Sequence, residues 1–148
     1  MISKILVTTD DSKIAKKAIR YAIDLAGQVK ASITLLAVID DRALIAQSIP
    51  IDMSQPQLIT PIENYLRTAA ERYLAKAQTL CRKKRVECRS VIRNGNPVDE
   101  IIMEAKKSKA DVIVMGSHGK GTFESAVLGS VTYGVIHKNT KYPVLVIR

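Results

Sequence analysis

The sequence predicts a Rossmann-like α/β domain with three layers and a five-stranded parallel sheet. Short apolar segments rich in β-branched residues alternate with amphipathic helical segments, in the order β-α-β-α-β-α-β-α-β. Strands that alternate with helices form a parallel sheet whose right-handed crossovers place helices on both faces. The length of 148 residues fits one domain with its own core.

The first half of the chain supplies two buried strands and the helix between them. Ile2–Thr9 and Ser32–Ile39 are mostly apolar runs that predict buried strands. Asp10-Asp11-Ser12 interrupts the first run, and Ser12 can cap the helix that follows. The apolar face of this helix is expected at Ile14, Ala18, Ala22, Leu25 and Val29. The Asp40–Ile59 segment contains two prolines and is expected to be a long surface connection.

The second half begins with a capping-box pattern, Thr60-Pro61-Ile62-Glu63, which predicts a helix running to about Lys84. Asn96-Pro97-Val98-Asp99 predicts another helix start by similar logic. The remaining elements are expected to be an edge strand at Val86–Arg93, a strand at Asp111–Met115, a helix at Ser130–Asn139 and a last strand at Pro143–Ile147.

A glycine-rich loop after the fourth expected strand is the most informative motif. Its spacing is Gly116-x2-Gly119-x9-Gly129-Ser130, and a helical segment opens at Ser130. Glycines let the backbone approach a ligand closely, and a helix that begins after one directs unpaired N–H groups at an anion. Parallel sheets bind ligands beyond the carboxyl ends of strands. Asp10 and Gly116 are therefore expected on the same rim, beside a ligand that carries phosphate.

The spacing of this loop excludes two common phosphate-binding motifs. A P-loop needs Gly-x4-Gly-Lys-Ser/Thr, but Val114 stands at the first glycine position and Gly121 follows Lys120. A dinucleotide fingerprint needs Gly-x-Gly-x2-Gly after the first strand. Here Gly119-x-Gly121 is followed by Glu124 and lies after the fourth strand.

The whole pattern resembles the universal stress protein family, specifically its ATP-binding branch. That family carries Gly-x2-Gly-x9-Gly-Ser/Thr after the fourth strand, which Gly116, Gly119, Gly129 and Ser130 match without a gap. The opening ILVTTDDS and the ending KYPVLVIR resemble the family's first and last strands, although many members have proline at the position of Thr8. The resemblance implies a universal stress protein-like nucleotide-binding domain over residues 1–148, with sheet order 3-2-1-4-5.

The loop and the resemblance together predict how a nucleotide is held. The backbone N–H groups of Gly129, Ser130 and Val131 are expected to face the phosphates, with Thr132 assisting. Asp10 is expected to contact ribose or adenine, to cap the following helix, or to do both. The candidate binding residues are Thr8, Thr9, Asp10, Val38, Met115, Gly116, Ser117, His118, Gly119, Lys120, Gly121, Gly129, Ser130, Val131 and Thr132.

Two of these candidates have ordinary alternatives, and a third is not given a catalytic role. Val38 either packs near the base, as the resemblance implies, or belongs to the sheet core. Lys120 either leans on the phosphates as a point charge or is solvated. His118 has no visible carboxylate or serine partner in the sequence, so it is not proposed as a catalytic base.

The composition of the chain indicates which binding partners to expect. The net charge of +9 suggests nucleic acid, but the basic runs 82–85 and 106–109 close expected helices, where cations complement the dipole. With one Phe and no Trp the chain shows no base-stacking platform, so nucleic-acid binding is not expected. Cys81 and Cys88 lie outside any metal-ligand or C-x-x-C pattern and are expected to be reduced, partly buried thiols.

Three functions are weighed. The leading one is a cytoplasmic protein, without signal peptide or membrane span, that binds ATP, ADP or AMP as a signal in a stress response. The second is a slow ATPase or nucleotidyl transferase, in which Asp10, Asp11, Asp40 and Asp41 hold Mg²⁺ through water, although no catalytic residue or direct metal ligand is recognised. The third is an interaction module, since Val144–Ile147 is expected at an edge and the resemblance implies a homodimer through this strand.

Overall fold

Five parallel strands form one sheet in the order β3-β2-β1-β4-β5, which confirms the expected topology. The computed structural model describes residues 1–40, 59–120 and 128–148. The elements are β1 (Lys4–Thr8), α1 (Lys13–Val29), β2 (Ser32–Ile39), α3 (Ile59–Lys83), β3 (Cys88–Asn94), α4 (Pro97–Ser108), β4 (Val112–Gly116), α5 (Ser130–Lys138) and β5 (Val144–Ile147). Nearly all of the expected connection after β2 lies outside the described residues.

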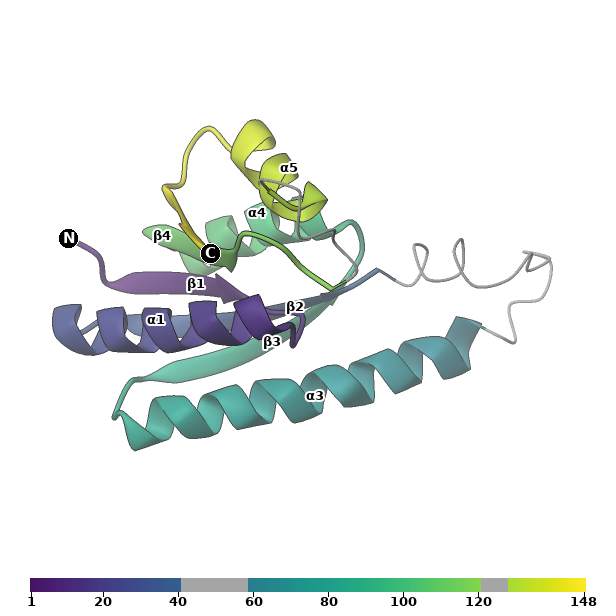
Figure 1. Cartoon of the computed structure of the whole chain (residues 1–148), viewed down its shortest axis with the longest axis horizontal. Helices are drawn as coiled ribbons and strands as arrows, with labels where there is room; N and C mark the ends of the chain where they lie inside the picture. The colour runs from purple at the N-terminus through teal and green to yellow at the C-terminus, as the bar shows by residue number, and fades with distance from the viewer. Residues whose placement is uncertain (41–58, 121–127) are drawn as a thin grey trace.

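The helices cover both faces of the sheet, with α1 and α3 on one side and α4 and α5 on the other (Figure 1). Successive side chains of β1 point to opposite faces of the sheet and so contact both helix layers. Ile5 and Val7 pack with α1 and α3, whereas Leu6 packs with α4 and α5. All three side chains are at most 1 % exposed. The three middle residues of the central strand are thus all apolar and buried, as expected of a parallel sheet that is covered on both faces.

The buried face of α1 agrees with the expected one at Ala18 and Ala22 and differs from it at the other three positions. The prediction followed the larger apolar residues, but Val29 is exposed, and Ile14 and Leu25 are half-buried. The buried residues of α1 are Ala15, Ala18, Ile19, Ala22, Ile23 and Ala26. Four of these six are alanines, whose small side chains let the helix approach the sheet closely.

Helix starts are set largely by the residues that the sequence indicates. Ser12 caps α1 by accepting the Ala15 N–H at 3.1 Å, and Asn96 caps α4 by accepting the N–H groups of Val98 and Asp99. The capping-box prediction for α3 is wrong in position, because Thr60 already lies inside the helix. The expected edge strand is confirmed at β3, which ends the sheet order.

Both cysteines are free, as expected. Cys81 is fully buried in the core under α3, and Cys88 at the start of β3 packs against the same core. A hydrogen bond from the Cys88 thiol lowers the pKa of Cys81, and the same contact together with burial raises the pKa of Cys88.

The strand order places a ligand site between β1 and β4. These two strands are neighbours, with Ile5 opposite Val112, although more than half of the sequence separates them. From β1 the chain continues outward through β2 on one side, and β4 continues outward to β5 on the other. Such a switch in strand order opens a crevice at the carboxyl edge of a parallel sheet.

Among the described helices, none has the length and apolar character that a membrane span requires.

Candidate functional site

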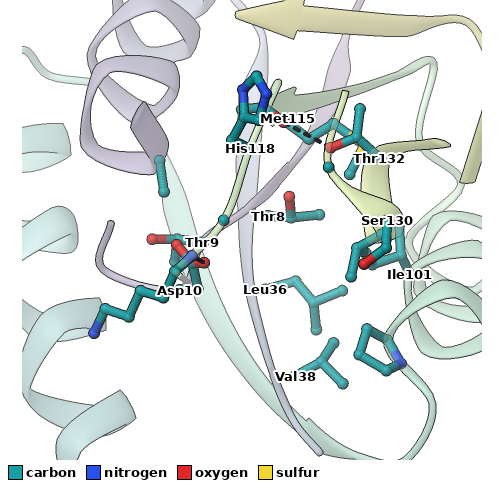
Figure 2. A pocket seen from close by; sticks show the side chains of 17 residues that line it. Thr8, Thr9, Asp10, Leu36, Val38, Ile101, Met115, His118, Ser130 and Thr132 are labelled. Atoms are coloured by element: carbon teal, nitrogen blue, oxygen red, sulfur yellow. Dashed lines mark hydrogen bonds between the residues drawn. The ribbon is translucent and has the colours of Figure 1, made fainter. Parts of the chain in front are cut away.

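A cavity of about 250 Å³ opens at the carboxyl edge of the sheet, between the ends of β1 and β4. Figure 2 shows Leu36 and Val38 on its floor, with Asp10 on one side and Ser130 and Ile101 on the other. The lining residues are Thr8, Thr9, Asp10, Ala15, Leu36, Val38, Pro97, Ile101, Met115, Gly116, His118, Gly119, Lys120, Gly129, Ser130, Val131 and Thr132. This set includes every residue of the expected site except Ser117 and Gly121, the latter lying outside the described residues.

Asp10 joins the end of β1 to the loop after β4. One carboxylate oxygen accepts the backbone N–H of Ser12 at 2.9 Å. The other accepts the backbone N–H of Lys120 at 2.8 Å, from a residue 110 positions away in the sequence. The turn between them includes Asp11, which has a left-handed backbone with φ of 65°. Asp10 therefore shapes the start of α1 and also fixes the position of the opposite loop.

Ser117 stabilises the loop from behind the cavity. Its backbone N–H donates to the Ile147 carbonyl at the end of β5, and its own carbonyl accepts the Gly129 N–H, both at 2.7 Å. Its side chain is 1 % exposed, and Oγ lies 2.8 Å from Nδ1 of His118. The expectation that Ser117 contacts the ligand is therefore not supported, because these bonds and its burial direct it to the loop's base.

The N-terminus of α5 points its first turn at the cavity. Gly129 is the N-cap and provides no side-chain cap. The first recorded backbone bond at this end joins the Tyr133 N–H to the Gly129 carbonyl, so the N–H groups of Ser130 and Val131 precede the intrahelical ladder. These donors and the positive end of the helix dipole suit an anion.

Two expectations for the α5 terminus need correction. The Gly129 N–H does not face the cavity as a free donor, because it already donates to Ser117. The Thr132 hydroxyl donates to the Gly116 carbonyl at 2.8 Å, so its proton ties α5 to the end of β4 (Figure 2). Thr132 can still accept a hydrogen bond, but it cannot offer its hydroxyl hydrogen to a phosphate without losing this contact.

Close packing leaves no room for a side chain at Gly116 or Gly119 and little room at Gly129. A Cβ on Gly116 would lie 2.7 Å from Cγ2 of Ile14, and one on Gly119 would lie 2.7 Å from Oδ2 of Asp10. A Cβ on Gly129 would lie 3.3 Å from the His118 backbone. None of the three has a positive φ; among the described glycines that conformation occurs at Gly95. The three glycines of the motif therefore stand where the loop packs closely against a neighbouring segment.

Charged groups around the cavity are mostly engaged with the protein itself. His118, for which the sequence showed no partner, does have a serine partner in Ser117. Asp11 forms an exposed ion pair with Lys16 at 3.4 Å. Burial and the nearby carboxylates of Asp10 and Asp11 raise the pKa of Tyr73 to about 12. The part of the chain that the structure describes contains no group of three or more acidic, His or Cys side chains able to hold a metal ion.

The sequence prediction missed four lining residues, Ala15, Leu36, Pro97 and Ile101. Two of them carry a usable signal. Leu36 precedes Val38 by two positions on the same strand and so shares its face. Pro97 follows the end of β3 and must therefore lie at the same carboxyl edge. Ile101 is then one helical turn further along α4.

The fold and this loop geometry agree with comparisons to known proteins. The family model described as "Universal stress protein family" matches residues 1–148. The chain belongs to the universal stress protein family. It is 32 % identical to universal stress protein MJ0531 of Methanocaldococcus jannaschii over 148 residues, which cover 100 % of this chain and 83 % of that protein. The solved structure of MJ0577 from the same organism superposes with a TM-score of 0.86 at 31 % identity, covering 99 % of this chain and 96 % of the other.

Two solved universal stress proteins of the same fold were crystallised with adenine nucleotides. One, from Archaeoglobus fulgidus, is in complex with dAMP and has a TM-score of 0.66 at 22 % identity, with full coverage of both chains. The other is in complex with cAMP and has a TM-score of 0.65 at 22 % identity, covering 99 % of this chain and 97 % of that one. At this identity the two structures establish a common fold.

Proposed function

We propose that this protein binds an adenine nucleotide, with ATP as the first candidate, and belongs to the ATP-binding branch of its family. The observation that carries the proposal is the cavity, which has a carboxylate at one side, an apolar floor, and an uncapped helix N-terminus at the other side. This arrangement matches the three parts of a nucleotide. The dAMP and cAMP complexes of structural relatives support the choice of adenine.

The lining suggests an orientation for the ligand. The base would pack on the apolar surface made by Leu36, Val38 and Ile101. The phosphates would lie at the N–H groups of Ser130 and Val131, because the dipole and the unpaired donors favour negative charge there. The Asp10 carboxylate would accept a hydrogen bond from the ribose.

We propose that the nucleotide acts as a bound signal in a stress response and is turned over slowly at most. Both carboxylate oxygens of Asp10 accept backbone N–H groups, and Nδ1 of His118 faces the Ser117 hydroxyl. Neither group is therefore placed as a ready base for activating water. The described residues contain no group of three or more acidic, His or Cys side chains, and Mg²⁺ is usually held by one or two carboxylates together with substrate phosphates, so we propose that any magnesium ion arrives with the nucleotide.

Calorimetric titration with ATP, ADP and AMP tests the binding proposal, using Gly129→Asp as the diagnostic variant. Gly129 has φ of −70° and ψ of 160°, values that an Asp N-cap adopts readily. The new carboxylate would occupy the donors meant for phosphate, so at least about a tenfold loss of affinity is expected. Gly27→Asp controls for the charge, because its Cβ would have nothing within 4 Å, and Gly129→Ala controls for the Cβ that would lie 3.3 Å from the His118 backbone. Wild-type protein that binds none of the three nucleotides would refute the proposal.

We further propose that the protein forms a homodimer through β5. This strand ends the sheet, and its sequence VLVI contains neither a charge nor a proline that would blunt an open edge. Val144, Leu145 and Val146 stay half-buried in the single chain, so pairing with a second copy would cover apolar surface. Light scattering at micromolar concentration should give twice the mass of one chain, and a monomeric mass would contradict this proposal.

A further inference from the structure

The amino edge of the sheet, opposite the nucleotide cavity, carries a dense cluster of cations. The helices α1, α3 and α4 all end at this edge, to the left in Figure 1, where β1 begins. Two neighbouring hollows of about 340 and 540 Å³ lie there and share Ser32 and Glu87 in their lining. The cations that line the two hollows are Lys4, Arg89, Lys107 and Lys109 in the first and Lys30, Lys84 and Arg85 in the second.

Helix-dipole compensation does not account for this amount of charge. Three helix C-termini contribute about half a negative charge each, roughly 1.5 in total. Seven cations line the hollows together with one acidic residue, Glu87, and a second carboxylate, Asp111, accepts the backbone N–H groups of Ser3 and Lys4 beside them. Two of the seven are paired elsewhere, Lys84 with Asp24 and Arg89 with Glu104. Within the described part of the chain no salt bridge is recorded for the other five, which leaves a positive surface at this edge.

The backbone adds an independent observation. Lys30, Arg85 and Lys109 have φ of 58°, 57° and 54°, so each stands in the left-handed conformation. Two of them, Lys30 and Lys109, are the C-caps of α1 and α4. Glycine takes this conformation without strain and is the usual residue after a helix end. The chain instead carries a cation at all three places, and all three line the two hollows.

We propose that this amino-edge surface, the two hollows lined by these seven cations, docks an acidic segment of a partner protein. Glu87 stands in the lining that both hollows share, so it divides the positive surface into two halves. A polypeptide can place acidic clusters in the two hollows and an uncharged residue at Glu87. A polynucleotide carries a phosphate at every step and meets repulsion there. The lining of the two hollows also contains no aromatic side chain on which a base can stack.

Fluorescence anisotropy with a labelled peptide tests the docking surface. The probe carries two Glu-rich clusters separated by a Gly-Ser spacer, and a peptide with Lys in place of Glu is the negative control. Lys84→Gln/Lys107→Gln removes one cation from each hollow, and neither position has a positive φ. Arg20→Gln/Lys76→Gln is the matched control, because it removes the same charge from exposed mid-helix positions of α1 and α3.

The edge variant should bind the peptide at least about tenfold more weakly, whereas the mid-helix variant should stay within about twofold of wild type. Binding should also weaken as salt is raised. Equal effects of the two variants would show attraction to net charge alone and would overturn the proposal, as would absence of peptide binding. If random-sequence duplex DNA displaced the labelled peptide at a lower concentration than unlabelled peptide does, the proposal would be wrong, because the surface would then favour nucleic acid over a protein. ATP titration of the edge variant separates this result from the nucleotide proposal, because the cavity lies at the opposite edge.

Discussion

Replacing Gly119 by alanine tests the joint between β1 and the loop after β4. The added Cβ would lie 2.7 Å from Oδ2 of Asp10, the same oxygen that accepts the Lys120 N–H at 2.8 Å. Carboxylate or loop must move, and the hydrogen bond is lost. Hydrogen bonds to charged groups contribute about 1.5–3 kcal/mol. Because Lys120 is exposed, we expect Gly119→Ala to lower the free energy of unfolding by about 1–2 kcal/mol.

Urea unfolding followed by circular dichroism measures this loss, with Gly27→Ala as the control. Nothing lies within 4 Å of a Cβ on Gly27, which is in α1, so alanine there should stabilise the protein by about 0.5–1 kcal/mol. The double-mutant cycle with Asp10→Ala identifies the cause. Once the carboxylate is gone, Gly119→Ala should cost less than about 0.5 kcal/mol. Additive losses, or a Gly119→Ala protein as stable as wild type, would refute the assignment of the clash to Asp10.

Three further substitutions test packing in the core and the dependence of the free energy of unfolding on pH above 10. Glu104 is 1 % exposed and accepts two hydrogen bonds from Arg93, at 2.9 and 2.7 Å. Glu104→Ala should lower the free energy of unfolding in urea by about 2–3 kcal/mol. This is less than for a fully buried ion pair, because Arg93 is partly exposed. Glu104→Gln should lower the free energy of unfolding by less than Glu104→Ala does. Equal losses for the two would argue against the ion pair. A Cβ on Gly134 would lie 2.6 Å from Cγ2 of Val98, so Gly134→Ala should cost about 1–3 kcal/mol by overpacking α5 against α4, with Val98→Ala as the rescue. The pKa of Tyr73 is raised from 10.0 to about 12, chiefly by burial, so the neutral phenol stabilises the fold below pH 10 and this contribution is lost as the pH rises from 10 to 12. Tyr73→Phe should flatten that part of the stability profile, and an unchanged slope would disprove the link.

Much of the fold was predictable because the elements have strong local signals. Ser32–Ile39 is β2 to the residue, since an apolar run flanked by polar residues admits one strand placement. Ser12 and Asn96 were predicted caps for the same reason: a capping side chain acts on N–H groups two or three residues away. The face of α1 was not predictable in this way, because the sheet selects it by how closely the helix approaches.

The position of the candidate site at the rim could be predicted from the sequence, but the hydrogen-bond partners inside it could not, because they come from distant segments. The rim residues follow from the rule for carboxyl ends, and Asp10, Gly116 and Ser130 do meet at one cavity. What each backbone group bonds to does not follow from that rule. The Gly129 N–H donates to Ser117, and the Thr132 hydroxyl donates to Gly116. The two arginine partners of Glu104, Arg89 and Arg93, could not be inferred either, because β3 and α4 meet only in the folded chain.

The central position of β1 has a consequence for synthesis. β2 covers one edge of β1 soon after translation begins, but β4 covers the other edge, and β4 starts at Val112. Until about three quarters of the chain has left the ribosome, β1 presents an unpaired apolar edge to solvent or to a chaperone. A fragment ending before Val112 should therefore aggregate. β4 and α5 are made late in synthesis, and they complete the pairing of β1 and the lining of the cavity. Acquiring a ligand would therefore report that these segments of a newly made chain have folded.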